Sequence, residues 1–91
     1  MNYFHIAALS AGASITKNPC KLHSVTINTK GITSNLLTLY DNNAGDSSGN
    51  VIAAIDTTAN VGHLIYDVDT RAGLSYVLAA GTAADVTVSY A

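Results

Sequence analysis

The chain has 91 residues, a net charge of −2 and 11% charged residues, against about 25% in an average soluble domain. This length predicts one domain, residues 1–91. The hydrophobic content of 48% excludes a disordered chain, and four Lys and Arg residues are too few to neutralise a run of phosphates, which excludes a nucleic-acid binder. The sequence contains neither the basic segment of a signal peptide nor the roughly 18 apolar residues of a spanning helix, so we expect no membrane partner.

With so little charge, the polar surface must come from Thr, Ser and Asn. A nearly neutral surface of this kind favours association between protein molecules. A small domain this apolar is expected to bury part of its surface against other subunits. We therefore predict self-assembly into a homo-oligomer or docking on a larger scaffold, with a monomer as the alternative.

Short strands are predicted from the N-terminus onward. Residues 2–9 alternate with Phe4 and Ile6 on one face, and a further short strand is possible at 13–16. Residues 21–29 show the clearest period of two, with valine and isoleucine alternating with polar side chains. Within them Leu22 has the wrong parity, which predicts a bulge or bend near His23.

The second half of the chain continues the same pattern. The loop at residues 41–50 is rich in Asn, Asp, Gly and Ser, which adopt turn conformations easily. Strand 51–55 should place Val51, Ala53 and Ile55 on one face. The other strands are expected at residues 36–40, 63–68, 74–78 and 85–90. Seven to eight short strands predict an all-β antiparallel sandwich, jelly-roll-like or immunoglobulin-like, and the pattern does not separate these two topologies.

Several segments together carry a resemblance to a known class of proteins. They are KLHSVTINT (21–29), LTLYDN (37–42), VIAAIDT (51–57), LIYD (64–67), GL (73–74) and GTAADVTVSY (81–90). In this order they resemble small β-rich virion structural proteins of tailed bacteriophages. Some proteins of that class are capsid decoration or cement proteins, commonly trimers that tie neighbouring shell subunits together.

This resemblance implies a virion structural protein on the capsid exterior, assembled in the host cytoplasm. Its expected partner is the major capsid protein or another virion protein, and a homotrimer is favoured. The alternative is a tail-fibre or adaptor sandwich that binds a host surface ligand or another virion protein. Residues 1–19 lie outside the resemblance and are a possible N-terminal attachment segment.

The residues that can carry chemistry do not form a catalytic pattern. Cys20 and His23 are three apart in an extended segment and should point to opposite faces, which argues against a thiolate–imidazole pair. His5, His23 and His63 lack the spacing of a metal-ligand pair, although one histidine per subunit around a three-fold axis can form a site. Their protonation can also make assembly sensitive to pH. We predict no enzyme activity and no cofactor.

The loop at 41–50 superficially resembles a calcium-binding loop. Asp41 and Asn43 fit such a loop, but Gly45 falls one position early and Ile52 stands where the bidentate acid belongs. A hairpin loop is therefore favoured over an irregular calcium site built on Asp41 and Asp46.

Interface candidates are chosen among the aromatic and aliphatic residues. Tyrosine is enriched at interfaces because its ring buries apolar area while its hydroxyl finds a partner. Tyr66, Tyr76 and Tyr90 share parity with aliphatic neighbours and are assigned to the edge of the core. The interface candidates are Tyr3, Phe4, Ile6 and Tyr40.

Overall fold

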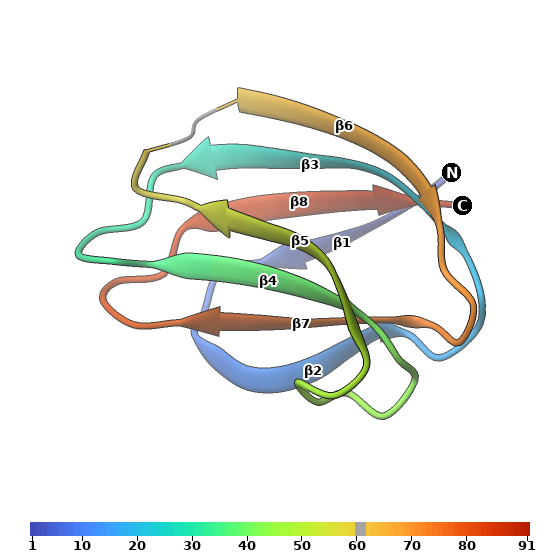
Figure 1. Cartoon of the computed structure of the whole chain (residues 1–91). Helices are drawn as coiled ribbons and strands as arrows, with labels where there is room; N and C mark the ends of the chain where they lie inside the picture. The colour runs from blue at the N-terminus through green and yellow to red at the C-terminus, as the bar shows by residue number, and fades with distance from the viewer. Residues whose placement is uncertain (60–61) are drawn as a thin grey trace.

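The computed structural model describes residues 1–59 and 62–91, and within these ranges it contains eight strands and no helix. All the strand pairs are antiparallel. The strands are β1 (Asn2–Ile6), β2 (Ser10–Thr16), β3 (Lys21–Thr29), β4 (Leu36–Asp41), β5 (Asn50–Asp56), β6 (Gly62–Asp69), β7 (Leu74–Ala79) and β8 (Asp85–Tyr90), as drawn in Figure 1.

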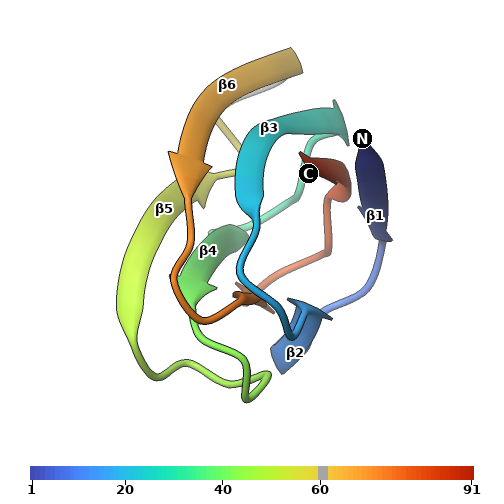
Figure 2. The ribbon, with the colours of Figure 1, turned by 90° about the vertical axis from the view of Figure 1, so that its right-hand side faces the viewer.

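The strands form two four-stranded sheets, in the orders β1-β8-β3-β6 and β2-β7-β4-β5. Figure 2 shows the sheets as two layers, with β1 and β2 at the same side of the molecule. Successive strands alternate between the layers except β4 and β5, which pair within one sheet, and this connectivity is that of a jelly roll. The predicted all-β sandwich is confirmed, and of the two topologies left open by the sequence the jelly-roll-like one is observed.

The core lies between the sheets and comes from the alternation of side chains along each strand. In β3, Val25 and Ile27 point inward, and in β4, Leu37 and Leu39 do the same, all at 1% exposure or less. The other buried hydrophobic residues are Ile6, Ile15, Leu22, Ala53, Ile55, Leu74, Tyr76, Leu78, Ala84, Val86 and Val88. The accessible surface is 4565 Å², close to the roughly 5,000 Å² expected for a folded chain of this mass.

The bulge predicted near His23 is confirmed. The register of β3 against both neighbours shifts between Leu22 and Ser24, so that Leu22 and Val25 can both face the core. Opposite it, β6 contains an extra residue, and Asp67 adopts a left-handed conformation with φ of 50°. The two irregularities lie side by side and bend the sheet at one place.

A second bulge overturns the orientation expected for Val51. Ala53 pairs with Leu39, but Val51 pairs with Tyr40, so the register shifts by one residue at Ile52. Ala53 and Ile55 therefore face the core, whereas Val51 faces outward and is 57% exposed. The alternation of residue types in the sequence contains no sign of this insertion.

The N-terminal residues are integrated into both sheets. β1 ends at Ile6, earlier than expected, because the chain must leave one sheet at residues 7–9 to enter the other at Ser10. β1 pairs with β8 and β2 pairs with β7. Residues 2–16 therefore form two edge strands of the sandwich, and the attachment role expected of residues 1–19 stays a prediction.

Candidate functional site: two unlike sheet faces

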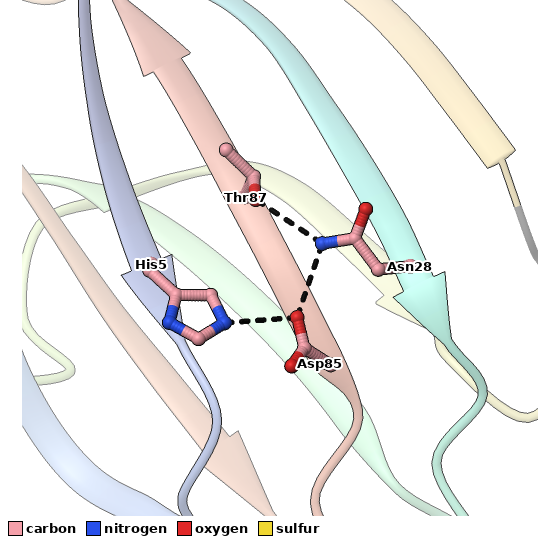
Figure 3. A network of polar contacts seen from close by, with 4 residues as sticks. All are labelled: His5, Asn28, Asp85 and Thr87. Carbon is pink, nitrogen blue, oxygen red and sulfur yellow. Dashed lines mark hydrogen bonds and ion pairs between the residues drawn. The ribbon is translucent and has the colours of Figure 1, made fainter.

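The outer face of the β1-β8-β3-β6 sheet carries many hydrogen-bonded polar side chains, beside the exposed Tyr3 and Ile65. It carries a network of side chains from three strands, shown in Figure 3. His5 Nε2 lies 2.9 Å from Asp85 Oδ1, and Asn28 Nδ2 donates to the same oxygen at 3.0 Å and to Thr87 Oγ1 at 3.1 Å. The hydrogen bond from Asn28, followed by that from His5, lowers the pKa of Asp85 below its ordinary value.

The other two histidines lie on the same sheet, and each has its own partner. His23 Nδ1 is 2.6 Å from Asp67 Oδ1, which joins the two bulges, and Thr26 Oγ1 is 2.8 Å from His63 Nδ1. We call this surface the histidine face; it comprises His5, His23, Thr26, Asn28, His63, Asp67, Asp85 and Thr87. In residues 1–59 and 62–91, no cluster of three or more His, Cys, Asp or Glu side chains is arranged to hold a metal ion.

The outer face of the β2-β7-β4-β5 sheet is apolar. Because Leu37 and Leu39 point inward, their neighbours in β4 point outward, and the register places residues of β5 and β7 beside them. Leu36 and Val51 are 42% and 57% exposed. We call this surface the apolar face; it comprises Leu36, Thr38, Tyr40, Val51, Ala54, Val77 and Ala79.

Buried polar side chains stand at one end of the apolar face. Asn35 is fully buried just before β4, where its Nδ2 donates to the carbonyl of Ala80 at 2.9 Å. Its Oδ1 accepts from the Thr57 hydroxyl at 2.6 Å and from the Ala84 N–H at 3.1 Å. One amide thus ties together the chain entering β4, the end of β5 and the loop between β7 and β8.

A second buried amide, Asn42, organises the opposite end, in the loop that superficially resembles a calcium-binding loop. Its Oδ1 accepts from the Ala44 N–H at 3.1 Å and from the Ser75 hydroxyl at 2.7 Å, and its Nδ2 donates to the carbonyls of Asp46 and Ser48. Asparagine is common in turns, so nothing in the sequence distinguishes Asn35 and Asn42 as the buried ones.

The carboxylate of Asp41 lies beside this loop and accepts hydrogen bonds from backbone N–H groups. It accepts N–H groups of Arg71 at 3.0 Å and Ala72 at 2.9 Å, which hold the strand-connecting segment after β6 in place. These hydrogen bonds, from Ala72 first and then Arg71, lower the pKa of Asp41. Asp46 accepts from the Ser48 N–H at 2.9 Å, so both acids of the considered calcium site have partners within the protein.

Cys20 and His23 form contacts with different residues. The Thr70 hydroxyl lies 3.5 Å from Cys20 Sγ and accepts the Cys20 N–H at 2.9 Å. The His23 imidazole pairs with Asp67. The structure therefore gives these two side chains structural partners and does not bring them together.

The four interface candidates lie in different environments. Tyr3 is 73% exposed and points outward from β1, and Tyr40 is half-buried on the apolar face. Phe4 points inward, with its ring centroid 5.8 Å from that of Tyr76. Ile6 is 2% exposed and belongs to the core. Tyr3 and Tyr40 thus keep surface that a partner can contact, whereas the side chain of Ile6 has none.

Comparison with known proteins gives a likeness of fold. No protein-family model matches the chain, and no curated protein sequence matches it. It is similar to the Drosophila NLP core, whose crystal structure is described as giving insight into pentamer formation and histone binding. The TM-score is 0.56 at 10% sequence identity, over 100% of this chain and 97% of the other.

This comparison corrects the expected virion function. A solved structure that shares the fold, the NLP core, is described in terms of pentamer formation and histone binding, and it is not a phage protein. The predictions of a capsid decoration or cement protein, of a tail-fibre or adaptor module, of a capsid partner and of a homotrimer are therefore wrong. The residues that carried the resemblance are largely strand and turn residues of the sandwich, and such residues report the fold and not the biological setting.

Among the described residues, no helix has the length and apolarity needed to cross a lipid bilayer.

Proposed function

We propose that this chain is a protein-assembly module without catalytic activity, which forms a homo-oligomer through its apolar face and, once assembled, binds another protein. The observation that carries the proposal is the outward exposure of Leu36 and Val51 on a sheet face that also presents Tyr40, Ala54 and Val77. A second copy of the chain is the proposed occupant of this face.

The composition of the face supports a contact with another copy of the chain. None of its seven residues is charged, and the acid beside them, Asp56, pairs with Leu36 at the end of β5, so a second copy can cover most of the face without desolvating an ion. Interface cores are generally depleted in charged residues and enriched in tyrosine. The histidine face differs, because its polar groups already have partners within one chain.

The energetics favour several contacts over one. Complete burial of a Leu or Val side chain contributes about 1.5–3 kcal/mol. Association costs about 4–15 kcal/mol before any gain is observed. Leu36 and Val51 alone therefore cannot hold a tight dimer, and a closed assembly, in which every copy makes more than one contact, is the arrangement that suits this face.

The NLP core, which shares the fold, is itself described in terms of pentamer formation, and this supports a ring of like subunits. Its histone binding is not part of our proposal. Six Asp residues against four Lys and Arg give a net charge of −2, which is too small to attract a strongly basic partner.

The test is the molar mass of the purified chain, measured by light scattering after size-exclusion chromatography over a range of concentrations. The wild-type chain should elute as an oligomer, and Val51→Lys should weaken assembly at least tenfold, which corresponds to about 1.4 kcal/mol. The matched control is Ile65→Lys, because Ile65 is a similarly exposed aliphatic residue on the other sheet, at 63%.

Two results would refute the proposal. The first is a wild-type chain that stays monomeric at high concentration. The second is an equal loss of assembly in the Val51→Lys and Ile65→Lys variants, which would show that added charge acts without regard to the face. A measured mass of five subunits would match the assembly of the NLP core, and another multiple would define a different ring.

A further inference from the structure

We infer that β1 is a second self-association site, at which the β1 strands of two copies pair antiparallel about a two-fold axis centred on Phe4. The inference rests on the proposed function, because it supplies the additional contact that the apolar face requires. Three features of β1 support it: its edge is open, the backbone groups of two of its residues face outward, and its residues are complementary across the axis.

Of the four strands at the edges of the described sheets, three are interrupted. β2 has two register shifts against β7, β5 has one against β4, and β6 contains the left-handed residue Asp67. Such bulges are a common way of preventing one sheet edge from adding to another. β1 pairs with β8 without any shift and contains neither proline nor a Lys, Arg or Asp side chain. It is therefore the regular, uncharged edge.

The hydrogen bonds at the end of β8 identify the free backbone groups. Lys21 and Ala91 exchange both backbone hydrogen bonds, at 2.8 and 2.9 Å, so the backbone groups of Ala91 face β3. Alternation along β8 then turns residues 86, 88 and 90 toward β1. These pair with Ile6, Phe4 and Asn2. The N–H and C=O groups of Tyr3 and His5 consequently point away from the sheet.

A two-fold axis at Phe4 uses all of these free groups. It places Tyr3 of each copy opposite His5 of the other, and each of the two pairs exchanges two backbone hydrogen bonds. Phe4 then lies opposite its own copy at a non-hydrogen-bonded position, where facing Cα atoms are about 4.5 Å apart. Aromatic pairs at such positions stabilise sheets.

The surroundings of β1 leave room for a second copy. In Figure 2, β1 lies at the outer margin of the molecule, beyond β2 of the other sheet. The contact with Asp85 holds the His5 imidazole over β8, as Figure 3 shows, so the ring does not cover the free edge of β1. Tyr3, at 73% exposure, would pack beside the partner's His5. The occupant is a second copy, because the strand is uncharged and its free groups are self-complementary about Phe4.

Disulfide trapping tests the register. In a Cys20→Ser background, Phe4→Cys should form a covalent dimer under mild oxidation, because the two sulfurs would join Cα atoms within the range that a disulfide spans. The matched control is Asn2→Cys, whose copies would lie four residues apart along the strand, about 13 Å. We expect Phe4→Cys to cross-link at least tenfold faster than Asn2→Cys. Equal rates, or no cross-linking of either variant, would overturn the inference.

A backbone variant tests the same contact without altering the core. Tyr3→Pro removes an outward N–H and leaves the hydrogen bonds to β8 in place, as proline allows on an edge strand. Tyr3→Thr keeps the N–H and removes the ring. Sedimentation should show assembly weakened at least tenfold by Tyr3→Pro, and less by Tyr3→Thr. Equal effects of the two variants, or an unchanged assembly in Tyr3→Pro, would refute strand pairing.

The failure of this inference can be separated from failure of the proposed function. In a Val51→Lys chain the apolar face is disabled, and cross-linking through Phe4→Cys should persist at an unchanged rate if β1 pairs independently. Loss of cross-linking in that background would overturn the two-fold contact at β1. If the apolar face does not support assembly, the cross-linking result still tests the contact at β1 by itself.

Discussion

The two outer faces of this sandwich differ in how their exposed side chains are accommodated. The histidine face is spanned by hydrogen bonds between exposed side chains of neighbouring strands, such as His5 with Asp85 and Thr26 with His63. The apolar face presents Leu36 and Val51 outward, and the polar groups that support its sheet are buried at the two ends. A hydrogen-bonded exposed face is satisfied within one chain, whereas an exposed aliphatic face gains free energy only when another surface covers it.

The same contrast predicts where the stability of a single chain resides. An exposed hydrogen bond that is lost is replaced by hydrogen bonds to water, so it contributes little to the free energy of unfolding. When a buried amide is removed, its buried partners are left without a hydrogen bond. The substitutions below compare equivalent changes in the two sheets, beginning with the largest expected effect.

The largest effect is expected from removing a buried asparagine. Asn35→Ala leaves the Ala80 carbonyl and the Ala84 N–H without their partner, and it leaves the Thr57 hydroxyl with only the main-chain carbonyl of residue 35, at 3.0 Å. We expect the free energy of unfolding to fall by about 3 kcal/mol, from several unsatisfied buried groups. Asn28→Ala, on the histidine face, should cost less than about 0.5 kcal/mol, because its amide is exposed.

Urea denaturation followed by circular dichroism measures both variants. Similar losses for Asn35→Ala and Asn28→Ala would show that the exposed network supports the sheet as strongly as the buried amide does. The distinction drawn between the two faces would then fail.

Much of the fold was predictable from the alternation of side chains. The strands at Lys21–Thr29 and Asp85–Tyr90 have the predicted bounds, because valine or isoleucine alternates with polar residues through much of each strand. The bulge near His23 was detectable from the parity of Leu22. Val51 was misplaced because an apolar residue fits either face of a sheet, and a one-residue insertion changes the face without changing the composition.

The candidate site was less predictable. Nothing in the sequence shows that all three histidines share one sheet, since this depends on the pairing of β1 with β8 and of β3 with β6. The exposed apolar face depended on sheet order in the same way. Of the four interface candidates, Tyr3 and Tyr40 keep accessible surface, whereas Ile6 was misassigned because its strand is apolar on both faces in sequence.

Acid sensitivity should also differ between the sheets. The pKa of Asp41 is lowered by backbone N–H groups, and the pKa of Asp85 is lowered mainly by one exposed amide. A carboxyl with a lowered folded-state pKa stabilises the fold above its unfolded pKa of about 3.8, and this contribution is lost as pH falls through the folded value. The wild-type chain should therefore lose stability as pH falls below about 4.

The two acids can be compared in urea titrations between about pH 2 and pH 6. Asp41→Asn should flatten the pH dependence of the unfolding free energy more than Asp85→Asn, because the segment around Ala72 depends on the Asp41 carboxylate. A slope for Asp41→Asn equal to that of the wild-type chain would mean that its backbone hydrogen bonds contribute nothing that depends on its charge.

The smallest effects are expected at two left-handed residues, Ala80 in the loop after β7 and Asp67 within β6. Ala80 has φ of 68° after β7, and its side chain makes no use of that conformation, so Ala80→Gly should raise stability by about 1 kcal/mol. Asp67 has φ of 50°, but its carboxylate bonds His23 at 2.6 Å, and Asp67→Gly exchanges relief of strain for loss of that contact. Its net effect should lie within about 0.5 kcal/mol of zero.

Thermal unfolding resolves this difference, because 1 kcal/mol shifts the midpoint of a domain of this size by about 4–8 °C. Ala79→Gly is the control for added flexibility, since Ala79 belongs to β7 and glycine in a strand weakens it. It should lower the midpoint that Ala80→Gly raises. A gain from Asp67→Gly as large as that from Ala80→Gly would show that the His23–Asp67 contact carries no stability. The histidine face would then be polar only because it is exposed to water, and not because its side chains hold neighbouring strands together.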